Sequence, residues 1–314
     1  MKDPLKLGRH AFKAMGGPCE LQVYAESVDT ARAALAAGEA EVRRLETKYS
    51  RYRNNSVTSA INRAAGGAAV DVDAETARLL DYAHTAWQQS GGVFDLTTGA
   101  LRRAWDFKAK RVPSQAQVDE VLRHVGWDKV QWHSPALSLP AGMELDFGGI
   151  VKEYAADCAA RVLAAAGIAH GFAELGGDIA IVGAHPDSAP WHVGVRDPRD
   201  PERAIATLEL DGGAIASSGD YERFFESGGR RYCHILDPRS GWPAQGLASV
   251  SVVAPQCLVA GTTSTVAMLM GPTEGPRWLE QLGLPHLCVG ADGSIHGTLA
   301  RFAPDPVQRA QRGQ

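Results

Sequence analysis

The sequence has no large excess of either charge. Its 36 acidic and 32 basic side chains leave a net charge of -4 over 314 residues. A protein that binds nucleic acid through bulk electrostatics needs a strongly basic surface. The composition therefore argues against that class, and we expect no nucleic-acid partner.

Paired cysteines and long apolar runs are also missing. The five cysteines are scattered, odd in number and form no CxxC pair, which argues against a disulfide framework and a thiolate zinc site. Residues 240–273 carry no charge, but their most apolar part, 257–271, is short and contains the hydroxyl run 262–265. This pattern predicts a buried helix rather than a membrane span.

No apolar leader segment is visible in the N-terminal stretch MKDPLKLGRHAFKAMGG. On the sequence as it stands we expect a cytoplasmic protein, or a periplasmic one if a leader has been removed. The motifs GxSxG, HExxH, Walker A and GxGxxG in a strand–helix context are absent as well. Their absence argues against esterase, zinc-protease and P-loop functions.

Glycine, in contrast, is abundant. The chain has 34 glycines in 314 residues, or about 11% against a typical share near 7%. No collagen-like period or low-complexity tract accounts for them. The surplus predicts many tight turns and close approaches of the backbone to other chain segments or to a ligand.

The first half of the chain predicts helices around few strands. Residues 19–25 alternate apolar and polar side chains, as a strand does. Helices are predicted at 30–47, from an N-cap at Ser56 to about residue 66, from an N-cap at Asp73 to about residue 90, and at 113–125. We expect a loop at 94–99 and two or three short strands within 128–146, followed by a strand at 143–147.

The second half is richer in strands. Helices are predicted at 151–166, 257–270 and 276–282, and strands at 170–174, 178–182, 191–196, 204–210, 214–217, 231–236, 248–253 and on both sides of the turn 291–293. Because hairpin-like runs dominate, we predict an α+β fold. The prediction is one compact two-lobed domain with mixed, mostly antiparallel sheets and flanking helices.

The segment ELDFGGIVKEYAADCAARVL carries the clearest chemical pattern. It predicts a strand, a Gly148-Gly149 turn and a helix whose first backbone N–H groups are unpaired. Lys152 stands in the first helical turn, where a cation is unfavourable unless an anion such as phosphate binds there. An ordinary glycine turn with a solvated lysine is the alternative, and the residues alone leave both open.

A second pattern is RRYCHILDPRSGWP, in which His234 lies in a short strand that ends at Asp237. A histidine near a carboxylate can act as a general base near neutral pH. The alternative is a strand histidine hydrogen-bonded by the turn. Phe94-Asp95 and Tyr52 likewise allow two interpretations, a contact to a ligand or an ordinary structural role. The hydroxyls of Ser264 and Thr265 are either metal or phosphate ligands or bond to their own helix.

Taken together and in order, these segments resemble the ApbE-like family of FAD:protein FMN transferases. The matching pieces run from about residue 14 to 271 and are AMGG, SRYRNNS with a later Asn62, GGVFDLTTGAL, LDFGGIVKEYAAD, ELGGDIAIVG, WHVGVRDP, AIASSGDYERFF, HILDPRSGWP and AGTTSTVAMLMG. Each piece is weak alone, but nine in the correct order are specific. We expect an ApbE-like domain at 14–302, with an N-terminal extension at 1–13 and a polar tail at 303–314.

The resemblance implies binding of FAD and magnesium-dependent transfer of FMN to a threonine or serine hydroxyl of an acceptor protein, with release of AMP. By motif position, His234 would be the general base, and the backbone carbonyl of Gly149 and the hydroxyl of Thr265 would bind Mg²⁺. The residues implied to contact FAD are Met15, Tyr52, Val93, Phe94, Asp95, Asp146, Lys152 and Ile235.

Two positions depart from the family pattern. Gly261 stands where the family has a metal-binding aspartate, and Glu153 stands where the family has a glycine. Glu153 could offer a substitute carboxylate, but the sequence alone does not say whether it points inward. Two alternatives to transfer therefore stay open: a non-catalytic FAD-binding protein, and a FAD pyrophosphatase that gives FMN and AMP.

Overall fold

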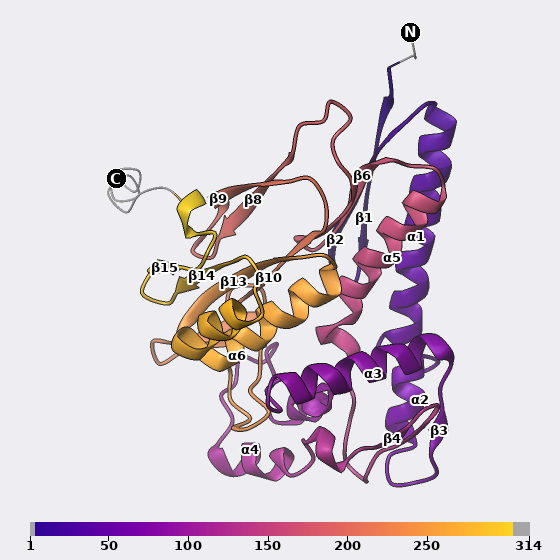
Figure 1. The fold of residues 1–314 in the computed structure, drawn as a ribbon. Helices are drawn as coiled ribbons and strands as arrows, with labels where there is room; N and C mark the ends of the chain where they lie inside the picture. The colour runs from indigo at the N-terminus through magenta and orange to yellow at the C-terminus, as the bar shows by residue number, and fades with distance from the viewer. Residues whose placement is uncertain (1–3, 304–314) are drawn as a thin grey trace.

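An eight-stranded sheet forms the centre of the molecule in the computed structural model, which describes residues 4–303 (Figure 1). The strand order is β1-β2-β6-β7-β10-β13-β14-β15, and every neighbouring pair is antiparallel. The strands are β1 (Lys6–Ala14), β2 (Gly17–Ala25), β6 (His170–Leu175), β7 (Asp178–Gly183), β10 (Ala214–Gly219), β13 (Leu247–Ala254), β14 (His286–Gly290) and β15 (Ile295–His296).

Three long helices pack with this sheet. They are α1 (Val28–Tyr49), α5 (Val151–Ala165) and α6 (Cys257–Gln281), and their buried faces share one hydrophobic core with the sheet. Figure 1 shows α1 and α5 side by side, with α6 crossing beside the strands β10 and β13. Alternation of buried and exposed residues along α1 places Ala34, Val42 and Leu45 inside.

A separate hairpin contributes a second, smaller core. Strands β8 (Trp191–Asp197) and β9 (Asp200–Leu210) pair with each other rather than with the large sheet. Their apolar residues, Trp191 and Leu208 among them, are buried with Ile215 of β10 and Ala248 of β13. The hairpin therefore packs on residues of the large sheet that do not belong to the main core.

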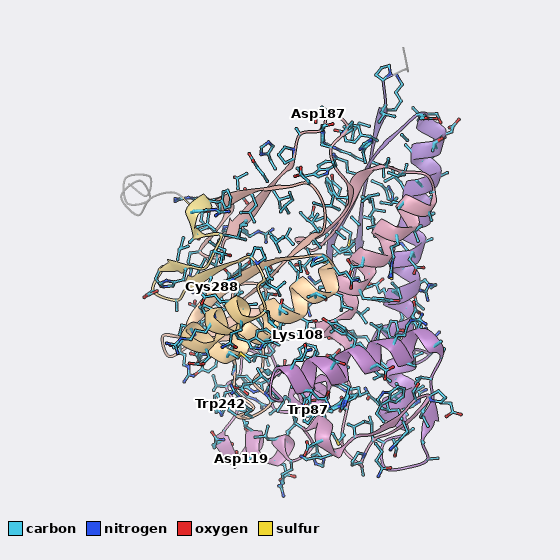
Figure 2. All side chains as sticks on the ribbon, viewed as in Figure 1. Trp87, Lys108, Asp119, Asp187, Trp242 and Cys288 are labelled. Carbon is cyan, nitrogen blue, oxygen red and sulfur yellow. The ribbon has the colours of Figure 1, made fainter. Side chains whose placement is uncertain are left out.

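A lower lobe holds the remaining elements. It contains α2 (Val57–Arg63), α3 (Ala74–Gln89), α4 (Gln115–Leu122), the small sheet of β3 (Val70–Asp71), β5 (Ala136–Ser138) and β4 (Gln131–His133), and the 3₁₀ helices η1 (Leu96–Arg103) and η2 (Trp127–Lys129). Trp242 lies beside α4 (Figure 2), where its indole N–H donates to Gln115 Oε1 at 3.0 Å. With Trp105, Phe225 and Tyr232 it forms a third apolar cluster.

Most of the expected elements are present, and the α+β class is confirmed. Ser56 and Asp73 cap their helices, because their side chains accept from the backbone N–H of Ser59 and of Glu75 and Thr76. The short strands β11 (Phe224–Ser227) and β12 (Arg230–Cys233) form a hairpin just before His234. The predicted strand 231–236 therefore ends early.

Four expectations were wrong in detail. The strand expected at 143–147 has no ladder partner, and its end is instead part of the 3₁₀ helix η3 (Phe147–Gly149). The loop expected at 94–99 runs into η1, which Asp95 caps. The two helices expected at 257–270 and 276–282 adjoin at Gly271, where φ is 82°. Finally, β1 pairs with β2 along its whole length, although no element was expected before residue 14.

The polar tail expected at 303–314 lies, beyond residue 303, outside the described residues.

Candidate active site

Glycine-rich turns bring the separated motifs together at one end of the large sheet. The β1–β2 turn contains Met15 and Gly16, with φ of 53° and 80°. A Cβ on Gly17 would lie 3.8 Å from Gly176 Cα in the β6–β7 turn, and one on Gly16 would lie 2.8 Å from the Arg223 guanidinium. The absence of side chains at these positions permits the close approach of three chain segments.

Lys152 lies next to this junction. Its stem packs near Gly176, since a Cβ there would lie 3.7 Å from Lys152 Cδ. Its ammonium forms ion pairs with Asp178 and, at 3.4 Å, with Glu153 Oε1. Although burial alone would lower the pKa of Lys152, the two carboxylates raise it above its usual value, so the side chain is charged at neutral pH.

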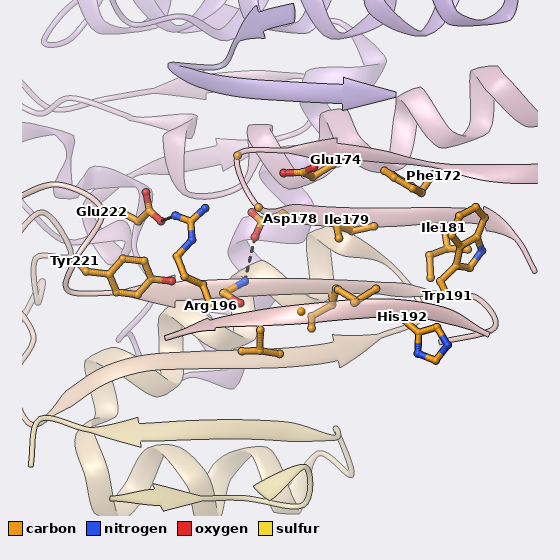
Figure 3. A pocket seen from close by; sticks show the side chains of 17 residues that line it. Phe172, Glu174, Asp178, Ile179, Ile181, Trp191, His192, Arg196, Tyr221 and Glu222 are labelled. Atoms are coloured by element: carbon orange, nitrogen blue, oxygen red, sulfur yellow. Dashed lines mark hydrogen bonds and ion pairs between the residues drawn. The ribbon is translucent and has the colours of Figure 1, made fainter. Parts of the chain in front are cut away.

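Asp178 holds this arrangement from the sheet. It begins β7 and is almost completely buried. One oxygen pairs with Lys152, and the other accepts a hydrogen bond of 3.0 Å from the backbone N–H of Ser217 on β10, drawn as a dashed line in Figure 3. Asp178 therefore ties α5 to two central strands.

Glu153 points inward from α5 onto α6. A Cβ on Gly261 would lie 2.9 Å from Glu153 Cδ and 3.1 Å from its Oε1, and closer still to Cγ. Burial raises the pKa of Glu153 to about 7; the nearby Lys152 opposes this shift and Asp178 adds to it. The sequence left the direction of Glu153 open, and in the structure its side chain lies next to Gly261.

Hydroxyl groups of α6 and β10 adjoin this pair. Ser218 Oγ lies 2.9 Å from Thr265 Oγ1 and 2.8 Å from Ser264 Oγ. Ser264 in turn donates to the backbone carbonyl of Gly261 at 2.9 Å, which is the bond to its own helix that the sequence left open. Thr265 is one helical turn beyond Gly261, so both lie on the same face of α6.

These residues fit a magnesium site in kind. Mg²⁺ prefers oxygen ligands and keeps several waters, so one carboxylate, one hydroxyl and one carbonyl form a suitable donor set. Glu153 Oε2 is buried and has no hydrogen-bond partner among residues 4–303. Within the same range no group of three or more His, Cys, Asp and Glu side chains could hold a metal. The fit therefore depends on three protein ligands, namely Glu153, the Thr265 hydroxyl and the Gly149 carbonyl, with waters for the remaining positions.

His234 follows β12 and lies near the same junction. Its backbone N–H donates to the carbonyl of Arg223 at 2.9 Å. The residue is exposed to solvent, although protein atoms surround part of it. This partial desolvation, together with the positive charges of Arg223 and Lys152, lowers the pKa of His234 to about 4. The imidazole is neutral at pH 7 and can accept a proton.

Asp146 has structural partners that the sequence did not reveal. Its carboxylate pairs with Arg51 and accepts from the backbone N–H of Gly148 at 2.9 Å. Asn62 holds the preceding residue, Leu145, through hydrogen bonds of 2.8 and 2.9 Å to its backbone. The SRYRNNS region and its later asparagine therefore secure the segment that leads into η3 and Lys152.

The run Val93-Phe94-Asp95 is buried rather than open. Asp95 accepts from the backbone N–H of Thr97 at 2.7 Å and of Trp127 at 2.8 Å, and burial raises its pKa. Phe94 is packed near Gly149, whose Cβ would lie 3.6 Å from the ring. Ile235 is buried, whereas Tyr52 is 84% exposed. The side chains of this run are therefore part of the packing around Gly149 and η1.

A cavity of about 270 Å³ borders the site between β8 and the sheet (Figure 3). The charged residues Asp178 and Arg196 lie toward one end, and Ile181 and Trp191 lie toward the other. None of the residues predicted to contact FAD lines this cavity. It meets the Lys152 cluster through Gly176, Asp178 and Ser217.

Three residues of the cluster were missed as candidates, namely Asp178, Ser218 and Arg223. Asp178 ends the quoted ELGGD motif, and the other two lie in the quoted AIASSGDYERFF. The signal that could have found Asp178 is its place directly after two glycines, where a carboxylate begins a strand. Its partner Lys152 is 26 residues away, so only the fold brings the two together.

Solved structures of flavin transferases have this fold. The ApbE protein of Thermotoga maritima superposes with a TM-score of 0.89 at 32% identity, over 96% of this chain and 100% of that one. The apo form of the flavinyl transferase ApbE of Pseudomonas stutzeri gives 0.85 at 28% identity, over 96% and 98%. The fold is therefore that of the ApbE class of proteins.

The ApbE family model matches residues 15–288, and the chain belongs to the ApbE family. Two relatives named FAD:protein FMN transferase, from Rhodobacter capsulatus and Treponema pallidum, are both 31% identical and cover 91% and 82% of this chain. The chain spans 56% and 77% of their lengths. Both relatives carry the name of a transferase that acts on flavin.

Proposed function

We propose that this protein transfers FMN from FAD to a threonine or serine hydroxyl of an acceptor protein, releases AMP and depends on Mg²⁺. The observation that carries the proposal is the Lys152–Glu153 pair, which faces Gly261 on α6, the helix that also carries Thr265. The charge of Lys152 also acts on His234, which is neutral at pH 7. The family relationship supplies the substrate class. The cluster supports the charge and proton chemistry that the reaction needs.

The chemistry is a phosphoryl-type transfer. The acceptor hydroxyl oxygen bonds to the phosphorus on the FMN side of the pyrophosphate, the bond from that phosphorus to the bridging oxygen breaks, and AMP leaves with the bonding electrons. His234 takes the hydroxyl proton. The charged Lys152 stabilises the negative charge that grows on the phosphate oxygens.

Divalent metal would add electrostatic stabilisation of the pyrophosphate when bound. Its ligands in this proposal are the Gly149 carbonyl and the Thr265 hydroxyl. The proposed FAD contacts are Met15, Tyr52, Val93, Phe94, Asp95, Asp146, Lys152 and Ile235. Because the side chains of Val93, Phe94 and Asp95 are buried, we propose that these residues contact FAD through their backbone groups.

A FAD pyrophosphatase is the second candidate. The observation that favours it is the solvent exposure of His234, which water can reach in the absence of an acceptor. Hydrolysis then uses the same base with water in place of the hydroxyl. The third alternative, a non-catalytic FAD-binding protein, is less favoured because Glu153 places a carboxylate beside Gly261.

The test is a reconstituted reaction with purified protein, FAD, Mg²⁺ and an acceptor that bears an S/T-G-A-T-like segment. We expect the acceptor to gain the mass of FMN and an equal amount of AMP to appear. FMN that accumulates without labelled acceptor would favour the pyrophosphatase. If neither product forms, both catalytic proposals are overturned and the FAD-binding alternative remains.

The acceptor and its compartment belong to the proposal as well. Among residues 4–303 no helix is sufficiently long and apolar to cross a membrane. We propose that the protein works either in the cytoplasm or in the periplasm. The compartment in which flavinylated acceptor is found in fractionated cells would decide between the two.

A further inference from the structure

The contact between α5 and α6 is fixed by a side chain of α5 that caps the start of α6. Asp157 of α5 accepts from the backbone N–H groups of Cys257 and Leu258 at 2.8 and 2.9 Å, and so caps the start of α6. One turn earlier on α5 is Glu153, and one turn later on α6 is Gly261. The cap therefore places Glu153 opposite Gly261.

Glu153 occupies the space that a side chain at position 261 would fill. A Cβ at Gly261 would overlap Glu153 Cγ and lie 2.9 Å from its Cδ. The residue typical of the family at position 261 is an aspartate, and the family residue at position 153 is a glycine. This chain therefore carries its carboxylate on the opposite helix, with the glycine facing it.

The carboxylate of Glu153 is not used up by its protein contacts. Its side chain is only 10% exposed. Oε1 faces Lys152 at 3.4 Å, but Lys152 already has Asp178 as its partner. Oε2 is buried and has no hydrogen-bond partner among the described residues. Buried polar atoms normally have partners, so this unpartnered carboxylate oxygen is available to a bound water or cation.

The surroundings select the kind of ligand. Two carboxyl groups, Glu153 and Asp178, face the single ammonium of Lys152, so the cluster favours an added cation over an anion at this point. The neighbouring oxygen donors belong to Thr265 and Ser218. Carboxylate and hydroxyl oxygens suit Mg²⁺ or Mn²⁺ rather than a softer metal.

We propose that Glu153 is the carboxylate ligand of the divalent cation, and that it performs from α5 the task that an aspartate at position 261 performs from α6. This inference rests on the metal dependence in the proposed function. It adds a residue-specific claim about this chain: the pair Glu153–Gly261 is one functional unit, so neither position can be interpreted alone.

The test measures metal binding without turnover. Mn²⁺ alone serves as the probe, and the free ion is followed by electron paramagnetic resonance during titration of the purified protein. We expect wild type to bind one Mn²⁺ and Glu153→Gln to bind it at least about tenfold more weakly, a loss that even outer-shell substitutions produce. Glu274→Gln removes an exposed carboxylate from the far part of α6 and should bind as wild type does.

The double exchange Glu153→Gly with Gly261→Asp completes the test. It moves the carboxylate to the other helix and should restore most of the affinity that Glu153→Gln loses. Unchanged affinity in Glu153→Gln, no Mn²⁺ binding by wild type, or a loss that the exchange does not repair would each overturn the proposal. Far-UV circular dichroism confirms that each variant is folded.

The Mn²⁺ titration and the transfer assay test the two proposals independently. Metal binding that depends on Glu153 in a protein that transfers no FMN would sustain this inference and overturn the proposed function. Transfer that proceeds in Glu153→Gln with unchanged Mn²⁺ affinity would do the opposite.

Discussion

Lys152 on α5 and Asp178 on β7 form a buried ion pair that joins the first turn of a helix to the centre of the large sheet. The carboxylate also accepts the backbone N–H of Ser217. The pair thus positions the ammonium and compensates its charge. It explains why a lysine is tolerated in the first turn of a helix, where the helix dipole opposes it.

Asp178→Asn should therefore be strongly destabilising. It leaves the Lys152 ammonium without its main counter-ion, and removal of one partner of a buried pair costs roughly 3–5 kcal/mol. Urea unfolding of the variant and of wild type measures the difference. The double variant Lys152→Met with Asp178→Asn is the control and should recover part of the loss; a wild-type midpoint in Asp178→Asn would contradict the structural role.

His234→Ala should abolish FMN transfer and leave FAD affinity largely intact. The ring supplies the base, whereas its backbone N–H, which holds Arg223, is retained in the variant. Transfer is measured by the mass of the acceptor, and FAD binding by quenching of flavin fluorescence. Full transfer by His234→Ala would refute the assignment of the base.

The pH dependence of transfer should reflect the low pKa of His234. Because that pKa is about 4, the ring is neutral and active above pH 4 and is protonated below it. We therefore expect the acidic limb of kcat/KM to fall near pH 4 rather than near 6.5, the usual value for imidazole. An acidic limb near 6.5 in folded protein would show that the ring is not desolvated. The residual rate of His234→Gln should lack this limb.

Gly261→Asp alone should not improve the enzyme. The new side chain would overlap Glu153, and overpacking of this kind costs about 1–3 kcal/mol. A lower melting temperature, measured by circular dichroism, is the expected result. Adding Glu153→Gly should relieve it, whereas a stable and more active single variant would show that Glu153 moves aside freely.

Asp95→Ala should affect folding more than it affects FAD binding. The carboxylate caps η1 and holds the backbone N–H of Trp127, so its loss leaves buried donors unpaired. We expect a loss of about 2 kcal/mol or more in the free energy of unfolding. If stability is unchanged while FAD affinity falls, Asp95 contacts the flavin directly. Asp119→Ala, on the exposed face of α4, is the control.

Local patterns predicted the helices and most strands well, because caps and periodicity act over a few residues. Ser56 and Asp73 cap α2 and α3 as their sequence contexts indicate. The strand expected at 143–147 failed for a non-local reason. Asn62 and the carbonyl of Leu96 take up the backbone groups of Leu145 and Asp146, so this extended segment joins no sheet.

In the candidate site, too, local motifs pointed to some residues, whereas others became visible only in the fold. The ordered motifs identified the family and pointed to Lys152, His234 and Thr265 from their local contexts. The proposed roles of these residues remain predictions that the experiments above test. Asp178 escaped notice because its partner is far away in the chain and its own surroundings resemble an ordinary strand start.

The sequence by itself determined the α+β class, the helix boundaries set by caps, the family and the presence of a glycine at 261 with a glutamate at 153. Only the tertiary structure decided that these two positions face each other. The reason is physical: the chemistry of residue 261 depends on what fills the space beside it. Asp157 sets that neighbour by capping α6 from α5, about 100 residues away in the chain.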